Sequence, residues 1–403
     1  MCYTQNRFNA LLSACVLSLT ATAGWSQSLT WLGTLGGNYS LAYGVSADGT
    51  VVVGLAGNAA RQERAFRWTA SGGMQDLGTL PGYDRSWAYG VSADGSVVVG
   101  WAENAAWQQR AFRWTENDGM QGLGTLGGDR SSAYAVSADG SVVVGRAVNA
   151  AGQWRAFRWT ENDGMQALGT LGGGWSEAYA VSADGAVVVG ASDWRAFRWE
   201  NGVMQALGTL GGNESWARGV SADGSVVVGW AENAAGQWRA FRWTENDGMQ
   251  ALGTLGGRRS AANDVSADGS VVVGWSENAA WVRYAIRWTA AGGMEDLNTT
   301  YASLLTNGSR LVEARAISPD GRYIVGYGLN NATNRTEAFL LDTRCTAHNG
   351  DMNGDGAVDD ADLLQVLFAL GNFCVGCPED LNGDNWVDDA DLLIVLSHFG
   401  SGC

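Results

Sequence analysis

Histidine, cysteine and lysine are scarce in this chain, and their absence limits the chemistry that it can perform. The 403 residues include two histidines, His348 and His398, and six cysteines. Residues 28–343 contain no histidine, no cysteine and no lysine. A Ser-His-Asp or Cys-His site is therefore excluded from that stretch, because both need a histidine base. Paired carboxylates for glycoside hydrolysis remain possible there, with Glu177 and Glu214 as candidates.

Basic residues are also few, and the acidity is concentrated at one end. The chain holds 25 Lys and Arg against 41 Asp and Glu, a formal net charge of -16. Residues 345–403 carry ten Asp, one Glu and no Lys or Arg, which is -11 of that total and leaves -5 for the remainder. No segment forms the basic stripe that nucleic-acid binding requires, so we expect no nucleic-acid partner.

The N-terminus has the order of a secretory signal peptide. Arg7 precedes an apolar stretch that begins at Ala10, and the small residues Ala21-Thr22-Ala23 follow it. We expect residues 1–23 to be removed and the protein to be secreted, extracellular or associated with the cell surface. Lipidation at Cys15 is a weaker alternative, because apolar residues continue beyond it. No other stretch is long enough to span a membrane.

Two acidic loops near the C-terminus share one spacing. A twelve-residue loop can supply Ca²⁺ with oxygen ligands from positions 1, 3, 5, 7, 9 and 12. In the two loops these positions are occupied by Asp351, Asn353, Asp355, Ala357, Asp359 and Asp362, and by Asp380, Asn382, Asp384, Trp386, Asp388 and Asp391. The sharp turn at position 6 falls on Gly356 and on Asn385, both residue types that tolerate a positive φ. The sequence predicts two calcium ions.

An apolar run with helical spacing follows each loop. The predicted apolar faces comprise Leu363, Leu367 and Leu370, and Leu392, Leu396 and Phe399. This duplicated loop-helix unit resembles a type I dockerin over roughly residues 349–400. The resemblance implies docking to a cohesin-type scaffold, although positions 10 and 11 of each loop are Asp-Ala where that family often has a hydroxyl pair. An acidic disordered tail is the alternative.

Four cysteines flank these loops. Cys345, Cys374, Cys377 and Cys403 remain after the signal peptide is removed, and an even number in an exported chain indicates disulfides, with three possible pairings. The symmetry of the two halves favours Cys345 with Cys374 and Cys377 with Cys403. Thiolate ligation of a metal by Cys374 and Cys377 is the alternative. We expect residues 345–403 to form a small domain stapled by disulfides and calcium.

The body of the chain is one unit of about 45 residues used seven times. Three motifs recur: Val-Ser-Ala-Asp-Gly before a valine run, Ala-Phe-Arg-Trp, and Leu-Gly-Thr-Leu. Four short strands per unit are typical of a propeller blade. Each unit is predicted to form four such strands: Ala-Tyr-Gly-Val-Ser, the valine run, Ala-Phe-Arg-Trp-Thr and Met-Gln-x-Leu-Gly-Thr-Leu. A lone fourth strand at residues 29–35 could pair with a final third strand at residues 338–342 and close a ring.

The predicted fold is therefore an all-β seven-bladed β-propeller over residues 28–343, followed by the small α-helical dockerin-like domain. A β-solenoid is the weaker alternative. The repeats also resemble the extracellular family named for a His-Ala-Phe tripeptide, the HAF repeat, although arginine replaces that histidine. The resemblance implies secretion and no particular activity.

Comparison among the repeats separates constant from variable connections. The Ser-Ala-Asp-Gly and Asn-Asp-Gly turns hardly change and are expected on one rim, with their aspartates as turn formers. The other two sets of connections vary and are expected on the opposite rim. This rim is predicted to gather eight tryptophans, Trp87, Trp107, Trp154, Trp175, Trp194, Trp216, Trp238 and Trp281. Exposed tryptophans beside polar groups suit sugar stacking, and packing between loops is the alternative for each.

These patterns favour a secreted, calcium-binding, non-enzymatic protein. We expect the propeller to bind a polysaccharide or surface partner and the tail to dock to a cohesin-type scaffold or envelope component. A polysaccharide-degrading hydrolase or lyase and a purely structural envelope protein are the alternatives.

Overall fold

The computed structural model describes residues 27–343, 358, 360–373, 377, 379–382 and 385–398. The predicted signal peptide, residues 1–23, lies outside these ranges. The chain separates into two compact units, and one of them is Ser28–Thr343. The C-terminal helices belong to the other unit and are described on their own below. No helix among the described residues is long and apolar enough to cross a membrane.

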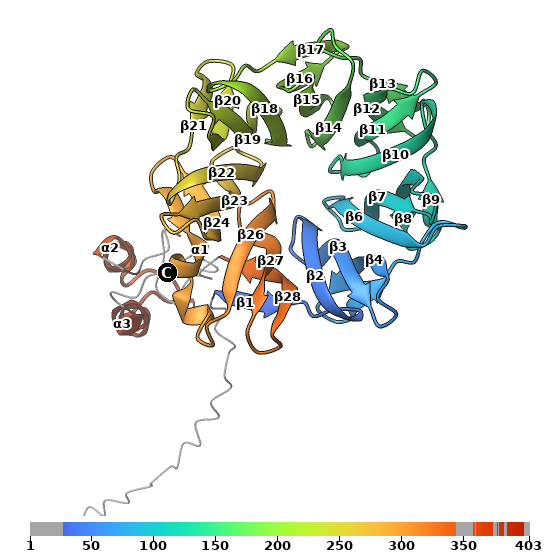
Figure 1. Ribbon diagram of the computed structural model, residues 1–403. Coiled ribbons are helices and arrows are strands. Elements are labelled where there is room, and N and C mark those ends of the chain that lie inside the picture. Colours follow the sequence, from blue (N-terminus) through green and yellow to red (C-terminus); the bar gives the residue numbers. More distant parts are fainter. Residues whose placement is uncertain are drawn as a thin grey trace, which may run out of the picture. The chain divides into compact units, whose positions relative to one another are not determined.

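Ser28–Thr343 forms a ring of antiparallel sheets (Figure 1). Five of the sheets have four strands, and an eight-stranded sheet comprises two further sets of four, which gives seven blades. The blades are β2 (Gly36–Val45), β3 (Val51–Asn58), β4 (Glu63–Thr69) and β5 (Gly73–Asp76); β6 (Arg85–Val91), β7 (Val97–Glu103), β8 (Gln109–Thr115) and β9 (Gly119–Gly122); β10 (Gly127–Val136), β11 (Val143–Asn149), β12 (Trp154–Thr160) and β13 (Gly164–Ala167); β14 (Ser176–Val181), β15 (Val187–Ser192), β16 (Arg195–Glu200) and β17 (Val203–Ala206); β18 (Gly211–Val220), β19 (Val226–Asn233), β20 (Trp238–Thr244) and β21 (Gly248–Ala251); β22 (Gly256–Val265), β23 (Val271–Asn278), β24 (Arg283–Thr289) and β25 (Gly293–Asp296); and β26 (Arg310–Ile317), β27 (Tyr323–Asn330), β28 (Arg335–Asp342) and β1 (Ser28–Trp31).

The ring closes where the sequence predicts. Strand β1, from the N-terminal end of the propeller, pairs antiparallel with β28, and Ser28 lies opposite Asp342. The seventh blade therefore takes its fourth strand from the opposite end of the chain. A single parallel bridge between Tyr39 and Thr336 joins this blade to the first one, which is why the two blades count as one eight-stranded sheet.

Two strand boundaries differ from the prediction. The fourth strand of each repeat ends before Leu-Gly-Thr-Leu, and Leu77, for example, instead follows β5 and donates its N–H to the Ala65 carbonyl. The first strand begins earlier than expected in four blades, so the variable segments at residues 38–41, 129–132, 213–216 and 258–261 lie inside β2, β10, β18 and β22. The later residues of each segment pair with the second strand of the blade after a register irregularity, as Ser40 and Leu41 pair with Ala56 and Leu55.

The valine runs form the core because neighbouring blades cover both faces of each second strand. Val51, Val52 and Val53 are all buried. Val51 and Val53 pack against the second blade, in a cluster that includes Phe112, whereas Val52 faces a cluster shared with the seventh blade. The glycine that follows each run is required by close packing: a Cβ on Gly54 would lie 2.0 Å from the Leu41 carbonyl oxygen.

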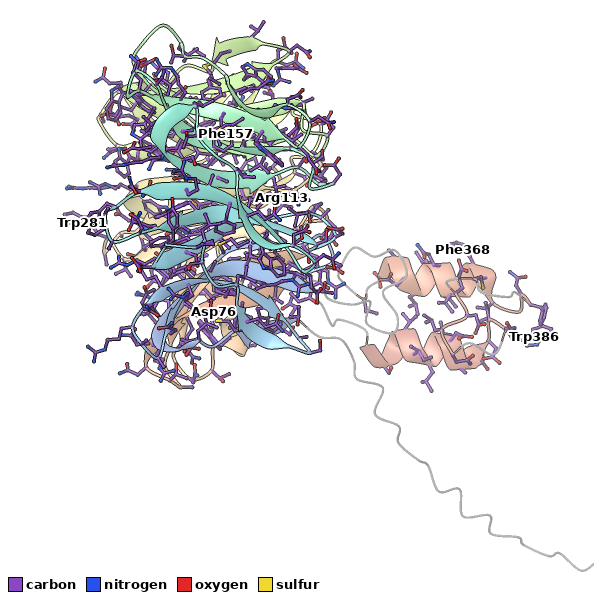
Figure 2. The ribbon with its side chains drawn as sticks, turned by 90° about the vertical axis from the view of Figure 1, so that its right-hand side faces the viewer. Asp76, Arg113, Phe157, Trp281, Phe368 and Trp386 are labelled. Carbon is purple, nitrogen blue, oxygen red and sulfur yellow. The ribbon has the colours of Figure 1, made fainter. Side chains whose placement is uncertain are left out.

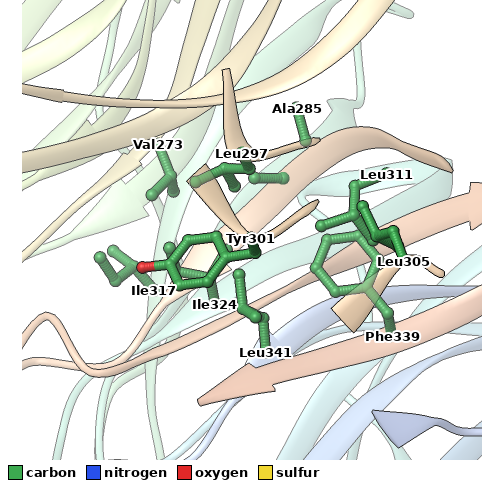
Figure 3. Close-up of a cluster of buried hydrophobic side chains, with 11 residues drawn as sticks. Val273, Ala285, Leu297, Tyr301, Leu305, Leu311, Ile317, Ile324, Phe339 and Leu341 are labelled. Carbon is green, nitrogen blue, oxygen red and sulfur yellow. The ribbon is translucent and has the colours of Figure 1, made fainter. Parts of the chain in front are cut away.

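The largest cluster lies between the sixth and seventh blades, beside the closure (Figure 3). The degenerate Leu-Gly-Thr-Leu copy begins α1 (Leu297–Thr300), which is followed by η1 (Ala302–Leu304). Leu297 and Tyr301 from this insertion are buried with Ile324 and with Phe339 of β28. The divergent last repeat thus adds apolar packing to the blade that is completed by β1.

The constant turns link the blades through the backbone. Ala47 donates its N–H to the Ala93 carbonyl of the next blade, and equivalent bonds continue from Ala93, Ala138, Ala183, Ala222 and Ala267. The last acceptor is the carbonyl of Pro319. A proline has no N–H, so this series of bonds cannot continue from the seventh blade to the first.

The C-terminal unit contains the two helices that the sequence predicts, α2 (Asp360–Ala369) and α3 (Asp389–His398). They pack through Val366 and Val395, with Val358 and Val387 also buried. The predicted faces are confirmed only in part: Leu363 and Leu392 pack against this core. Leu367, Leu370 and Leu396 are exposed, because the valine one position earlier on each helix fills the core. Phe399 lies outside the described residues, and the dockerin identity of this unit stays a prediction.

Candidate functional site

The antiparallel order of each blade fixes which loops share a rim. The Ser-Ala-Asp-Gly turn joins strands one and two and the Asn-Asp-Gly turn joins strands three and four, so both lie at the same end of the blade. Two cavities between neighbouring blades confirm this placement, since Ser96 and Asn117 line one of them and Ser141 and Asn162 the other. The opposite end of the ring, which we call the variable rim, carries the remaining two sets of connections.

The aspartates of the constant rim are turn formers, as predicted. In the fifth blade, Asp223 accepts hydrogen bonds from the Ser221 hydroxyl at 2.7 Å and from the Ser225 N–H at 3.0 Å. These bonds, the Ser221 hydroxyl foremost, lower the pKa of Asp223 to about 2. A carboxyl group held ionised in this way suits a structural role and not general acid catalysis.

Four tryptophans of the variable rim are exposed: Trp107, Trp194, Trp238 and Trp281. The most exposed are Trp107 at 63% and Trp281 at 61%. Figure 2 shows Trp281 projecting from one side of the ring and Arg113, which lines the constant-rim cavities, toward the other. The rim therefore presents four large apolar rings to solvent.

The other four predicted rim tryptophans are covered to different degrees. Trp154, Trp175 and Trp216 are half-buried. Trp87 is only 8% exposed, because it stacks on Trp101 with their ring centroids 3.9 Å apart. Packing is thus the better interpretation for Trp87, whereas its neighbours on the rim keep accessible surface.

Trp107 and Trp281 occupy a strained turn. In five blades the turn between strands two and three has the sequence Asn-Ala-Ala-X-Gln or Asn-Ala-Ala-X-Val. The Asn side chain accepts a hydrogen bond from the backbone N–H of the residue after X; the Asn104 side chain, for example, accepts the Gln108 N–H at 3.0 Å. Residue X has positive φ in all five: Arg61, Trp107, Gly152, Gly236 and Trp281. Left-handed backbone is unfavourable for a bulky L-residue, so tryptophan is present at a cost in stability.

Trp194 reaches a similar position by another route. The fourth blade has a shorter connection, in which Asp193 and Trp194 have φ of 51° and 67°. Two consecutive positive φ values at the centre of a two-residue hairpin are typical of a type I′ turn, which strongly favours Asn and Gly. Three exposed tryptophans of the rim therefore sit where a glycine would be more stable.

Arginines accompany the exposed rings. The Arg258 guanidinium lies 4.3 Å from the Trp281 ring centroid, and that of Arg259 lies 5.0 Å from Trp238. Arg85 lies 5.8 Å from Trp107. All three come from the variable segments or from the start of a first strand. Each pair offers an aromatic face with a hydrogen-bond donor beside it, a combination that suits a polar ring-shaped ligand.

A second candidate site, which sequence reasoning missed, is the central channel. A cavity of about 520 Å³ lies there and is lined by the first strands of all seven blades. One equivalent position per blade supplies its side chains: Tyr43, Tyr89, Tyr134, Tyr179, Arg218, Asn263 and Arg315. The available signal was the residue that follows the constant Ala of the first-strand motif, which is tyrosine in four repeats and arginine or asparagine in the other three.

The four tyrosines form a continuous belt. Their ring centroids are 4.7 Å apart between Tyr43 and Tyr89, and 5.4 Å apart both between Tyr89 and Tyr134 and between Tyr134 and Tyr179. Burial raises the pKa of Tyr89 to about 12. These phenols are therefore neutral at physiological pH and offer polar hydroxyls on an aromatic wall.

Two of the three channel arginines are paired with carboxylates. Arg146 Nη1 lies 2.6 Å from Glu177 Oε1, and Arg315 Nε lies 2.8 Å from Glu313 Oε1. Glu313 is buried and also pairs with Arg283. Glu177, one of the two candidates for paired-carboxylate hydrolysis, is thus engaged by an arginine, and it also accepts the Tyr179 hydroxyl.

Arg218 differs from these arginines. Among the residues that the structure describes, it has no carboxylate within ion-pair distance and donates no hydrogen bond. Its guanidinium lies 4.2 Å from the Tyr179 ring centroid and 5.9 Å from that of Trp216. Asp264 also lines the cavity, but it accepts the N–H groups of Val265 and Ile317. Burial raises the pKa of Asp264 to about 6.

Aromatic contacts connect the channel with the variable rim. Trp216 lies 6.0 Å from Tyr179 in the channel and 6.0 Å from the exposed Trp194. It also contacts Trp230, which in turn lies 4.7 Å from Trp238. The rim and the channel therefore share one aromatic surface, with Trp216 at its centre.

The second acidic loop of the tail is partly described. Asn385 has φ of 70° at position 6, as its place in the loop requires. Asp380 Oδ2 accepts the Asn385 N–H at 2.8 Å, and the buried Asp391 accepts the N–H groups of Leu381, Asn382 and Asp388. The loop thus wraps around two of its predicted ligands, and its donor set is the oxygen-rich one that Ca²⁺ prefers.

The rest of the predicted calcium set is incompletely visible. Asp362, at position 12 of the first loop, is fully buried like Asp391. Asp351, Asn353, Asp355, Ala357, Asp359 and Asp384 lie outside the described residues, as do Cys345, Cys374 and Cys403. Within the described ranges no three acidic, histidine or cysteine side chains converge as a metal site. The calcium ligands and the disulfide pairing therefore stay predictions.

Comparison with known proteins adds little to this geometry. No known protein family matches the chain, and no curated protein sequence matches it. Among solved structures, TolB from Acinetobacter baumannii is similar with a TM-score of 0.40 and 13% identity, over 52% of this chain and 53% of that one. A protein assigned as TolB from Agrobacterium tumefaciens has a TM-score of 0.43 and 14% identity, over 67% of this chain and 94% of that one. The chain spans about half the length of the first of these, and similarity at this level carries no functional conclusion.

Proposed function

We propose that this protein is a secreted, non-enzymatic binding protein whose propeller recognises a polysaccharide on the variable rim. The observation that carries the proposal is the placement of Trp107 and Trp281, which are exposed, stand beside arginines and occupy a backbone conformation that favours glycine. Strain of this kind is concentrated at functional positions, because packing alone does not select for it. Sugar rings stack on such faces and accept hydrogen bonds from the adjacent guanidinium groups.

Titration with soluble glycans, followed by tryptophan fluorescence and calorimetry, tests this half of the proposal. We expect binding by the unmodified protein and a clear loss of affinity in the double variant Trp107→Ala/Trp281→Ala. Arg61→Ala is the matched control, because Arg61 occupies the same turn with the same left-handed backbone but carries no aromatic ring. Binding that survives the double variant unchanged, or no binding across a varied panel of glycans, would contradict the proposal.

The tail is proposed to bind two calcium ions and to dock to a cohesin-type scaffold or an envelope component. Two exposed apolar pairs support a docking role: Leu364 and Leu367 on α2, and Leu393 and Leu396 on α3. They occupy equivalent positions, 29 residues apart, in the two copies of the loop-helix unit. Phe368, 84% exposed, extends the surface on α2 (Figure 2). Cys345, Cys374, Cys377 and Cys403 would staple this unit by two disulfides.

A pull-down from the native extracellular fraction, with and without a calcium chelator, tests the tail. We expect one partner to be retained by the full-length protein in calcium and released by the chelator. The variant Leu364→Asp/Leu393→Asp should lose that partner while calcium binding continues, because neither residue belongs to the predicted ligand set. Retention of the partner by this variant would contradict docking through the exposed leucines.

A polysaccharide-degrading enzyme is the second candidate function, supported only by the carboxylates Glu177 and Glu214. Glu177 is committed to Arg146 and Tyr179, which leaves it poorly suited to exchange a proton with a substrate. Release of reducing sugars from the same glycan panel would establish this alternative. A purely structural envelope protein would show neither glycan affinity nor a chelator-sensitive partner.

A further inference from the structure

The central channel contains an unpaired cation in a setting where its neighbours are paired. Arg146 and Arg315 each have a glutamate of this chain at ion-pair distance, whereas Arg218 has none among the described residues. All three arginines line the same cavity of about 520 Å³. Its volume falls within the range of about 300–1,000 Å³ that is typical of small-ligand sites.

We propose that the channel is a binding site for the carboxylate of an acidic saccharide, and that Arg218 holds this carboxylate. The inference deepens the glycan binding proposed above and rests on it for the choice of ligand class. A guanidinium group offers paired N–H donors that match a carboxylate. The same channel already makes this pairing twice with its own glutamates, so a ligand carboxylate would complete the third.

A second unsatisfied donor lies beside Arg218. The indole Nε1 of Trp216 is buried and has no hydrogen-bond partner in the described part of the chain. Buried donors are normally satisfied, so each exception calls for an explanation. The Arg218 guanidinium lies 5.9 Å from the Trp216 ring centroid, but Trp216 does not line the cavity, so this indole lies behind the channel wall and Arg218 is the donor that faces the ligand. The tyrosine belt supplies further hydroxyls and an aromatic wall for a sugar ring.

The aromatic surface links this site with the rim. Trp216 contacts Tyr179 on one side and the exposed Trp194 on the other. A saccharide chain that stacks on rim tryptophans could therefore place one acidic unit in the channel. An acidic peptide also carries carboxylates, but a peptide does not need a continuous set of stacking faces, and for this reason a saccharide fits better.

Calorimetry on the full-length protein with tri-galacturonate and with its fully methyl-esterified form tests the inference. The two ligands differ in charge and share the sugar backbone. We expect the acid to bind about tenfold tighter or more, the scale of one charge-assisted hydrogen-bonded pair. Arg218→Gln should abolish this preference. Arg218→Lys should retain part of it, because the charge remains while the paired donor geometry is lost.

Arg130→Gln is the control, since Arg130 is an exposed arginine at the start of β10 that does not line the cavity. It should leave the preference unchanged. Circular dichroism checks that Arg218→Gln is folded. If Arg218→Gln unfolds, the affinities of Arg218→Lys for acid and ester test the inference instead. Equal affinity for acid and ester, or a preference for the acid that survives Arg218→Gln, would overturn the inference. Neither result would contradict the binding of neutral glycans at the rim. Conversely, an Arg218-dependent preference that Trp107→Ala/Trp281→Ala does not alter would support the channel site and count against the rim.

Discussion

Glycine and alanine substitutions at residue X of the Asn-Ala-Ala-X turns would measure how much the left-handed backbone at this position lowers the stability of the propeller. Five equivalent turns place Arg61, Trp107, Gly152, Gly236 and Trp281 at φ between 59° and 76°. This backbone costs an L-residue about 1–2 kcal/mol, whereas glycine adopts it freely. The five positions thus form an internal series in which the backbone is constant and only the side chain changes.

The magnitude follows from the space around the turn. A Cβ added to Gly152 would meet no atom within 4 Å, so the backbone conformation alone decides the effect. The greater freedom of glycine in the unfolded chain offsets about 0.4–1 kcal/mol of the strain. We therefore expect Gly152→Ala to destabilise by roughly 0.5–1 kcal/mol, and Trp107→Gly to be more stable than Trp107→Ala by a similar amount.

Equilibrium urea unfolding provides the measurement, read as a shift of the midpoint at constant slope. Ala106→Gly is the control, because Ala106 precedes Trp107 in the same turn without a positive φ, and glycine should there be destabilising. If alanine matched or exceeded glycine at both Trp107 and Gly152, the turn would not be strained. The argument that binding maintains the exposed tryptophans would then lose its basis.

Three further predictions concern the blades, the pH dependence and the tail. Ser131→Ala should destabilise the propeller by about 1–3 kcal/mol in urea unfolding. The reason is that the buried Ser131 hydroxyl accepts the Ala111 N–H of the preceding blade and donates to the Gly124 carbonyl. As the control, Ser96→Ala at an exposed position should change stability by less than about 0.5 kcal/mol. Asp223 has a folded-state pKa of about 2, below its ordinary pKa of 3.8. Its stabilising contribution is therefore present above pH 3.8 and is lost as the pH falls toward 2. Asp223→Asn should flatten that part of the pH dependence of unfolding, and an unchanged profile would contradict this role. Calcium at 100 times its Kd should stabilise the tail by about 2.7 kcal/mol for each bound ion. Asp391→Ala should reduce the calorimetric stoichiometry from two ions to one, whereas an absence of calcium binding by the unmodified protein would refute the site.

Much of the propeller could be predicted because its signals are local and repeated. Alternation of valine runs with polar glycine turns predicts short buried strands, and seven copies predict a ring of blades. The incomplete units at the two ends also predicted the pairing of β1 with β28, which the structure confirms. The exact strand ends were less predictable, since in the variable segment at residues 38–41 Ser40 and Leu41 pair with β3 only after a register irregularity.

The tail shows the limit of a helical pattern. Leucines at a regular spacing predicted a buried face. Leu363 and Leu392 do pack against the core, but Val366 and Val395 occupy its centre while Leu367 and Leu396 are exposed. Both faces of these helices are apolar, so spacing alone cannot choose between them. Contact between the two helices makes the choice, and it leaves the leucines available to a partner.

The sequence by itself determined the number of repeats, the strand order within each blade, the constant turns and the residue types on the variable rim, because these depend on short-range pattern and turn chemistry. Only the tertiary structure decided which tryptophans are exposed, that Trp87 is covered by Trp101, and that Arg218 lacks the carboxylate that Arg146 and Arg315 have. These properties depend on contacts between residues of different strands and blades, which ring closure brings together and which no local pattern specifies.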